Sequence, residues 1–302
     1  MLKSSICKQE DLESSAFQKI EDELKTREWL ALHNTNRYKY DPSTILHRKS
    51  WEFSYITLAL QERGMLQEGK KGLGFAVGEE PLPAFYASRG CEILATDLGM
   101  ASREAKRWAQ TGQNAAGDIG CLNALCLCPD ELFQRNVRYR DIDMNDIPED
   151  LDGKFDFCWS SCAIEHVGSL EKSKQFLKNM LKTLRPGGVA IHTTEFNLSS
   201  NISTVEFGNS VIYRRKDILE IEAYMSQHGH KMELDFSLGS KEGDLFVDTY
   251  PYYASPPLQY HLRLRQYPNR YCKILYYLCG RGILNRLGWD CTSIGLIIHK
   301  GD

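Results

Sequence analysis

Long apolar runs are missing from this sequence, and none reaches the ~20 consecutive apolar residues that a transmembrane helix requires. Residues 1–30 alternate charged and apolar side chains, so they lack the continuous apolar segment of a secretory signal peptide. We therefore expect a cytoplasmic protein. The net charge of −3 also lacks the basic excess of proteins that bind nucleic-acid phosphates, and no nucleic-acid partner is expected.

A zinc-binding cysteine pattern is also missing, although the chain has ten cysteines. Cys121, Cys126 and Cys128 lie close together, but their spacing is not that of a zinc knuckle and no histidine follows nearby. Several other cysteines lie in apolar, strand-like runs, where a free thiol packs as a small hydrophobic group. We expect reduced thiols and no structural zinc.

Alternation of strand-like and helix-like segments is the main pattern that is present. The 302 residues are 42% hydrophobic, enough for one large α/β domain with additions or for two domains. Strands alternating with helices predict a mostly parallel sheet. We expect strands at 73–77, 92–96, 136–139, 155–159, 189–194, 231–236 and 293–299, and helices at 8–32, 43–65, 79–88, 101–111, 170–184 and 217–228.

Residues 71–98 organise the rest of the chain. They combine a short apolar strand, a turn flanked by Gly74 and Gly78, a helix ended by Gly90, and a second strand that ends at Asp97. In an open parallel sheet, ligands bind beyond the carboxyl ends of the strands. A glycine turn followed about 20 residues later by a carboxylate is typical of a site for a ribose-containing cofactor, since one carboxylate accepts two hydroxyl hydrogen bonds.

The residues after the turn decide between classes of cofactor. A phosphate-binding loop carries Lys-Ser/Thr at this point, whereas Glu79 and Glu80 follow Gly78 here and would repel a phosphate group. A dinucleotide is disfavoured for the same reason. S-adenosylmethionine fits better because it is a sulfonium with an amino-acid tail and a ribose.

Five segments resemble the motifs of class I S-adenosylmethionine-dependent methyltransferases, in the same order along the chain. Residues 72–78, Gly-Leu-Gly-Phe-Ala-Val-Gly, resemble the first motif, acid-x-Gly-x-Gly-x-Gly. Asp97 matches the ribose-binding acid, and Asp143-Met144 resembles the loop beside the adenine. Residues 155–161 resemble the motif at the reaction centre, and residues 185–188, Arg-Pro-Gly-Gly, match the turn before the fifth strand.

Two positions of the first motif depart from the family pattern. Gly72 replaces the usual acid, which leaves open how the amino group of the cofactor is held, and Ala76 replaces the middle glycine. The resemblance implies S-adenosyl-L-methionine as the cofactor. The cofactor-binding residues that it implies are Gly74, Phe75, Ala76, Gly78, Asp97, Leu98, Asp143, Met144, Ser160 and Ser161.

The fold implied by the resemblance is α/β, with a Rossmann-like, doubly wound sheet of seven strands whose last strand is antiparallel. We expect an N-terminal helical cap over residues 1–66 and the cofactor-binding core over residues 67–200. Residues 201–302 should supply acceptor-side elements and the final strands of the same domain. The regions outside the motifs should carry acceptor specificity.

Candidate catalytic residues follow the fourth and fifth expected strands. His166 is the candidate general base because imidazole titrates near neutral pH, and Glu165 and His192 are further candidates at the same edge. Glu165-His166 has two other interpretations, a structural helix start or a metal site. Cys162 stands where metal-dependent relatives carry a glutamate, so we expect no metal. His261 is an outlying base candidate.

Residues 250–289 are rich in tyrosine and basic side chains, with eight tyrosines, six Lys/Arg and no Asp or Glu. Tyrosine with arginine suits a sugar ring, a nucleotide-linked sugar or a phosphorylated group, so the acceptor is expected to be a small molecule or saccharide and an anionic one is included. Two other interpretations remain open. Residues 271–289 could make peripheral contact with an anionic membrane, or the segment could be a helical cap with a solvated basic face.

The sequence therefore predicts a methyltransferase that acts on a hydroxyl of a small-molecule or saccharide acceptor. Within enzymes, the alternatives are an N- or C-methyltransferase or a protein methyltransferase. From another class, the alternative is a non-catalytic scaffold or sensor that binds S-adenosylmethionine. Turnover separates the last alternative from the enzymes.

Overall fold

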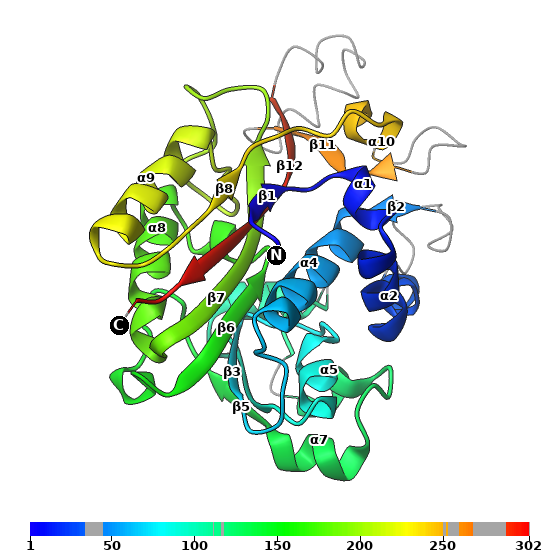
Figure 1. Cartoon of the computed structure of the whole chain (residues 1–302), viewed down its shortest axis with the longest axis vertical. Helices are drawn as coiled ribbons and strands as arrows, with labels where there is room; N and C mark the ends of the chain where they lie inside the picture. Colours follow the sequence, from blue (N-terminus) through cyan, green and yellow to red (C-terminus); the bar gives the residue numbers. More distant parts are fainter. Residues whose placement is uncertain are drawn as a thin grey trace.

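The computed structural model describes residues 1–33, 45–110, 112–115, 118–249, 252, 260–267 and 288–301 (Figure 1). Residues 271–287, most of the segment considered for membrane contact, lie outside the described residues, as do Tyr250 and Tyr253. Within the described ranges, no helix combines the length and apolarity that crossing a bilayer requires.

Five parallel strands form the centre of the sheet. They are β3 (Lys71–Phe75), β4 (Glu92–Asp97), β5 (Val137–Asp141), β6 (Phe155–Ser161) and β7 (Leu184–Asn197). Their order in space is β5-β4-β3-β6-β7, so β4 and β5 are added on one side of β3, and the order then reverses as β6 and β7 are added on its other side. That reversal point is where doubly wound sheets bind ligands. The Rossmann-like α/β fold expected from the sequence is confirmed.

The last strand, β12 (Trp289–His299), runs antiparallel to β7, as expected. The N-terminal strand β1 (Ser4–Ile6) was not expected: it pairs antiparallel with β12 and parallel with β8 (Leu234–Asp235), and so lies between them (Figure 1). With β11 (Arg263–Gln266) on β12 and β9 (Val247–Asp248) on β11, the sheet has ten strands within the described residues, three more than expected. Three residues are too few to show a period-two pattern, which explains why β1 was missed.

Helices cover both faces of the sheet (Figure 1). One face carries α4 (Arg48–Glu62), α5 (Leu82–Ser88) and α7 (Asp130–Asn136), which bury Phe53, Tyr86 and Phe133 in one hydrophobic core. The other face carries α8 (Leu170–Asn179) and α9 (Arg215–Gln227) over a second core. The remaining short elements are α1 (Gln9–Leu12), α2 (Ser15–Glu23), α3 (Thr26–His33), α6 (Arg103–Ala109), α10 (Glu242–Leu245), η1 (Ile119–Asn123), η2 (Glu149–Leu151), η3 (Ile164–His166), η4 (Met180–Thr183) and the paired strands β2 (Leu46–His47) and β10 (Tyr260–His261).

Several elements differ from the sequence-based prediction: the strand expected over residues 231–236 is only Leu234–Asp235, and the helix expected over residues 43–65 begins at Arg48. The single helix expected over residues 8–32 is broken into α1, α2 and α3, because Ser14 caps the start of α2 and Lys25 takes a left-handed φ of 50°. The Arg-Pro-Gly-Gly segment forms an irregular bulge within β7 rather than a turn before it. The boundaries proposed at residues 66 and 200 stay a prediction.

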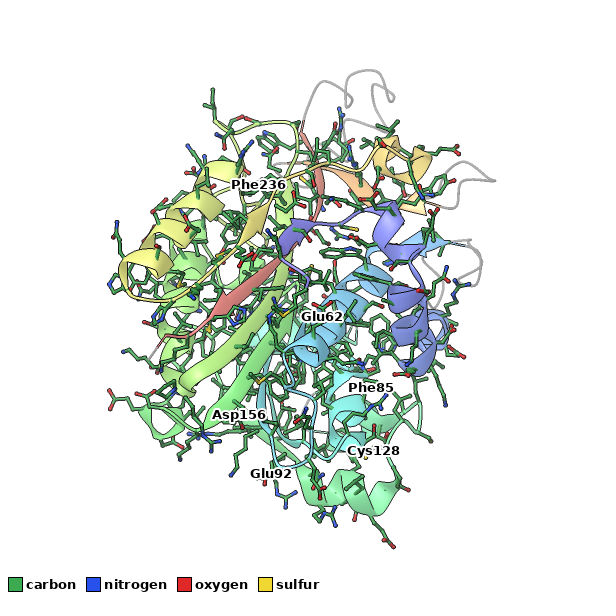
Figure 2. The ribbon with its side chains drawn as sticks, in the orientation of Figure 1. Glu62, Phe85, Glu92, Cys128, Asp156 and Phe236 are labelled. Atoms are coloured by element: carbon green, nitrogen blue, oxygen red, sulfur yellow. The ribbon has the colours of Figure 1, made fainter. Side chains whose placement is uncertain are left out.

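The amino ends and the carboxyl ends of the parallel strands differ in what surrounds them. Glu92 and Asp156, labelled in Figure 2, lie at the amino ends of β4 and β6, and Asp156 accepts hydrogen bonds from Lys71 N and Arg185 Nη1 at 2.8 and 3.2 Å. This edge is closed by structural contacts. A ligand-binding site is therefore expected on the opposite side, at the carboxyl ends of the parallel strands.

Replacing Gly295 with alanine should lower the free energy of unfolding by about 1–3 kcal/mol, because a methyl group on this β12 residue would overlap the buried ring of Tyr55 on α4. Chemical denaturation would measure the change. Gly120→Ala is the matched control, since its new methyl would meet only the Asp118 side chain at 3.1 Å. Equal stability of the two variants would contradict close packing of α4 on β12.

Candidate functional site

A cavity of about 930 Å³ lies beyond the carboxyl ends of β3, β4, β6 and β7. Its walls come from three sources: the loops after these strands, the N-terminal part of α4, and residues near β10. A volume of this size is at the upper end of the range for small-molecule sites. Seven of the ten residues implied to bind the cofactor line it: Ala76, Gly78, Asp97, Leu98, Asp143, Met144 and Ser161.

The loop after β3 forms one end of the cavity. Ala76 and Gly78 have φ values of 49° and 55°, in the left-handed region, so the backbone turns sharply at both. A Cβ on Gly78 would approach the backbone of Gln113 to 3.2 Å, which makes glycine the residue that fits this close approach. Gly74 and Phe75 precede the turn and pack inside the sheet, against Trp159 and Phe176, rather than on the cavity wall.

Asp97 is held at the tip of β4 by backbone groups. Its carboxylate accepts hydrogen bonds from Gly78 N at 3.2 Å and from Ala115 N at 3.0 Å. Only 2% of the residue is exposed, and this burial raises the pKa of Asp97 to about 7. A carboxylate has about four lone-pair sites, so further hydrogen bonds to a ligand remain available.

A second buried acid lies beside the glycine loop. Glu80 is 5% exposed, and its Oε1 accepts a hydrogen bond from Trp159 Nε1 at 2.7 Å. Burial raises the pKa of this carboxyl to about 8. Helix α3 is fastened to the same loop, because Trp29 Nε1 donates to Glu79 O at 2.7 Å and His33 Nε2 lies 3.1 Å from Glu79 Oε2.

The chemistry of this end fits the cofactor that the resemblance implies. Its carboxylates favour a cationic sulfonium and an ammonium group over a phosphate group. Leu98, Ile142 and Met144 supply apolar surface for an adenine ring. Asp143 is exposed between them and accepts from Asn145 N at 2.8 Å. The carboxylates in the cavity wall are Glu79, Glu80, Asp97, Glu104, Asp143, Glu165 and Glu195.

The predicted site residues at the ends of β6 and β7 lie on two different faces of the sheet. Ser160 and His192 face α8, where Ser160 Oγ lies 2.8 Å from His192 Nδ1 and the imidazole meets the Phe176 ring edge-on. Complete burial lowers the pKa of His192 to about 3. Neither residue lines the cavity, whereas Ser161 does, and Lys49 Nζ donates to Ser161 Oγ at 3.1 Å.

His166 and Glu165 lie on η3 and line the cavity. His166 Nδ1 is 2.5 Å from Asn209 O, and its ring packs against Trp108 with centroids 4.7 Å apart. Burial lowers the pKa of His166, so the imidazole is neutral at pH 7. Thr194 Oγ1 donates to Glu165 Oε2 at 3.0 Å, and burial, reinforced by Glu195, raises the pKa of Glu165 to about 8. No group of three metal-ligating side chains is gathered in the part of the chain that the structure describes.

Residues outside the motif region complete the wall. Arg48 is the first residue of α4, His47 is the β2 residue that precedes it, and Glu195 comes from the end of β7. His261 Nδ1 lies 3.2 Å from Asp248 Oδ2, and its ring is 4.7 Å from that of His47. Sequence reasoning missed Asp248 because β2, β9 and β10 have two residues each and are brought together only by tertiary pairing.

Comparisons with known proteins agree with this geometry. Residues 73–192 match the family model described as a methyltransferase domain. No curated protein sequence matches the chain. Among solved structures, the [4+2]-cyclase SpnF is similar over 99% of both chains, with a TM-score of 0.51 and 16% identity, which shows a shared fold.

Two further structures are similar to the chain at lower scores. A candidate sarcosine dimethylglycine methyltransferase from Galdieria sulphuraria covers 93% of this chain and 98% of its own, with a TM-score of 0.49 and 16% identity. Phosphoethanolamine N-methyltransferase 2 from Haemonchus contortus, solved with phosphomonomethylethanolamine and S-adenosylhomocysteine, covers 96% and 61%, with a TM-score of 0.45 and 12% identity.

The glycine loop, the acid at the tip of β4 and the family match thus agree over one continuous stretch of the chain. Residues 73–192 therefore form a methyltransferase domain with the features of the class I S-adenosylmethionine-dependent enzymes, and S-adenosyl-L-methionine is its cofactor.

Proposed function

We propose that this methyltransferase methylates a hydroxyl group of a small, uncharged, saccharide-like acceptor. The observation that carries the proposal is the polar but charge-balanced wall beyond β6 and β7. Both cations that α4 places there are paired: Arg48 with Glu195 at 2.6 Å, and Lys49 with Glu52 at 2.8 Å. Such pairing removes the excess positive charge that would select an anionic acceptor.

The residues at the other end of the cavity would hold the cofactor. Asp97 would accept hydrogen bonds from the ribose hydroxyls, and the turn at Gly78 lets the ligand approach the backbone closely. Glu80, once ionised, would compensate for positive charge on the cofactor, a role open because Gly72 replaces the acid of the first motif. Asp143 and Met144 would border the adenine. When bound, the cofactor supplies a methyl group on a sulfonium centre.

The chain itself has to position the acceptor and take its proton. His166 is the proposed base, because donation of its Nδ1 proton to Asn209 O leaves Nε2 as the proton acceptor on the cavity side. Glu165 would remain largely protonated at neutral pH and would contribute a hydrogen-bond donor next to it. His261, held by Asp248, is another imidazole in the same cavity and the competing candidate.

Matched acceptors test the proposal. The protein would be incubated with tritiated-methyl S-adenosylmethionine and either methyl glucoside, glucosamine or glucuronate, and the labelled atom would be located by NMR. We expect label on a hydroxyl oxygen of the neutral sugar and weaker transfer to glucuronate. Label on nitrogen would replace the proposal with an N-methyltransferase. Tight cofactor binding with no transfer across a wider set of hydroxylated molecules would favour the non-catalytic alternative.

A further inference from the structure

The Arg48–Glu195 pair joins two elements across the acceptor side of the cavity. Arg48 is the first residue of α4, and Glu195 lies near the carboxyl end of β7. The pair meets end-on through one atom of each group, Nη2 and Oε1, at 2.6 Å. Both residues line the cavity, with side chains that are 16% and 7% exposed. The pair is therefore a buried part of the wall.

The second atom of each group is unsatisfied. Arg48 Nη1 and Glu195 Oε2 are buried, and neither has a hydrogen-bond partner within the described part of the chain. A buried donor or acceptor without a partner is destabilising, and native structures rarely retain one without a functional reason. The pair consequently keeps one unused donor and one unused acceptor within the cavity wall.

The neighbouring ion pair, Lys49–Glu52, has no such unsatisfied arrangement within the described residues, so of these two pairs only Arg48–Glu195 has unused atoms. Lys49 Nζ bonds Glu52 at 2.8 Å and also donates to Ser161 O at 3.2 Å. Glu52 in turn accepts from Ser293 Oγ. The Lys49–Glu52 pair is thus satisfied inside the protein, whereas the Arg48–Glu195 pair one residue earlier on α4 is not.

The titratable groups around the pair are either neutral or, like Lys49 and Glu52, paired with an opposite charge, which narrows the class of ligand. Burial lowers the pKa values of His47 and His261 well below their usual range, and the pKa of Glu165 is raised to about 8. A charged ligand would upset the charge balance of the pair, while an uncharged group with both a donor and an acceptor would satisfy it. Two adjacent hydroxyl groups have this chemistry.

We propose that Arg48 and Glu195 form an acceptor subsite for two adjacent hydroxyl groups of a neutral polyol. One hydroxyl oxygen accepts from Arg48 Nη1, and the other hydroxyl donates to Glu195 Oε2. This subsite rests on the proposed function, because it binds the acceptor in the same cavity. The two hydroxyl groups that it binds anchor the acceptor, and a different hydroxyl group is methylated.

Binding of small probes to the protein saturated with S-adenosylhomocysteine tests the subsite without turnover. Calorimetry or ligand-detected NMR would compare cis-1,2-cyclohexanediol, cyclohexanol and cyclohexanecarboxylate. We expect the diol to bind about tenfold more tightly than cyclohexanol, because the second hydroxyl adds a hydrogen bond to a charged group. Equal binding of diol and cyclohexanol, or tighter binding of the carboxylate, would overturn the subsite.

Variants then assign the preference to these residues. Glu195→Gln should remove the advantage of the diol over cyclohexanol, while Glu220→Gln, on the outer surface of α9, should leave it unchanged. A diol preference that survives in Glu195→Gln would place the hydroxyls elsewhere. The outcome is separate from that of the proposed function: methylation at nitrogen would refute O-methylation and leave the diol preference standing, and calorimetry of S-adenosylhomocysteine reports independently on the cofactor site.

Discussion

Replacing Asp97 with alanine should weaken binding of S-adenosyl-L-methionine by about 100-fold or more. A hydrogen bond to a charged group contributes about 1.5–3 kcal/mol, and the ribose would lose two of them, which gives about 3–6 kcal/mol. Isothermal calorimetry with the cofactor and with S-adenosylhomocysteine would measure the loss. Asp97→Asn keeps an oxygen that can accept from Gly78 N and Ala115 N, so it separates loss of the ligand contact from loss of the loop.

Asp141→Ala is the matched control for this prediction. Asp141 pairs in register with Asp97 at the end of the neighbouring strand, but it is exposed and does not line the cavity. Undiminished cofactor affinity in both Asp97 variants would mean that the ribose is bound elsewhere.

In the wild-type protein, affinity for the cofactor should rise as pH increases through about 7, where Asp97 ionises. Asp97→Asn should retain only the later rise, near pH 8, that ionisation of Glu80 provides.

Replacing His166 with alanine should lower kcat for methyl transfer to a hydroxyl by about 100- to 10,000-fold, the usual contribution of a general base. Cofactor affinity should not change, because His166 lies on η3 on the acceptor side of the cavity. Single-turnover kinetics with labelled cofactor would isolate the chemical step. His166→Gln retains polarity without a titratable nitrogen and should be equally slow.

Two further variants make this prediction specific. His228→Ala serves as the control, since His228 is exposed on the surface and its Nδ1 also contacts a backbone carbonyl, Tyr224 O at 2.7 Å. His261→Ala tests the competing imidazole. If His166→Ala keeps its rate while His261→Ala loses it, the proton is taken by the histidine that Asp248 holds, and the role proposed for His166 is wrong.

The orientation of neighbouring strand residues illustrates what the sequence left open. His192 and Glu195 lie three residues apart near the end of β7, and the sequence placed the first of them among the catalytic candidates. Side chains alternate between the two faces of a strand, so His192 faces Phe176 on α8 while Glu195 reaches Arg48 on α4. Which face borders the cavity depends on how the helices pack, and a single strand sequence does not contain that information.

The proposed cofactor end of the site could be predicted from the sequence because the residues that form it lie close together along the chain. The turn at Gly78, the acid at Asp97 and the strand between them lie within 30 residues, and backbone geometry dictates their residue types. The sequence alone therefore determined the fold class and the methyltransferase domain, and it predicted the end of the sheet at which we propose that the donor binds.

Only the tertiary structure decided which residues line the side of the cavity that we assign to the acceptor. The α4 residues Arg48 and Lys49, Glu195 of β7 and His261 beside Asp248 come from segments far apart in the chain, and two-residue strands hold some of them in place. The physical reason is that charge balance and hydrogen-bond satisfaction are properties of neighbours in space. No spacing along the chain records whether an arginine meets its carboxylate with one nitrogen or with two.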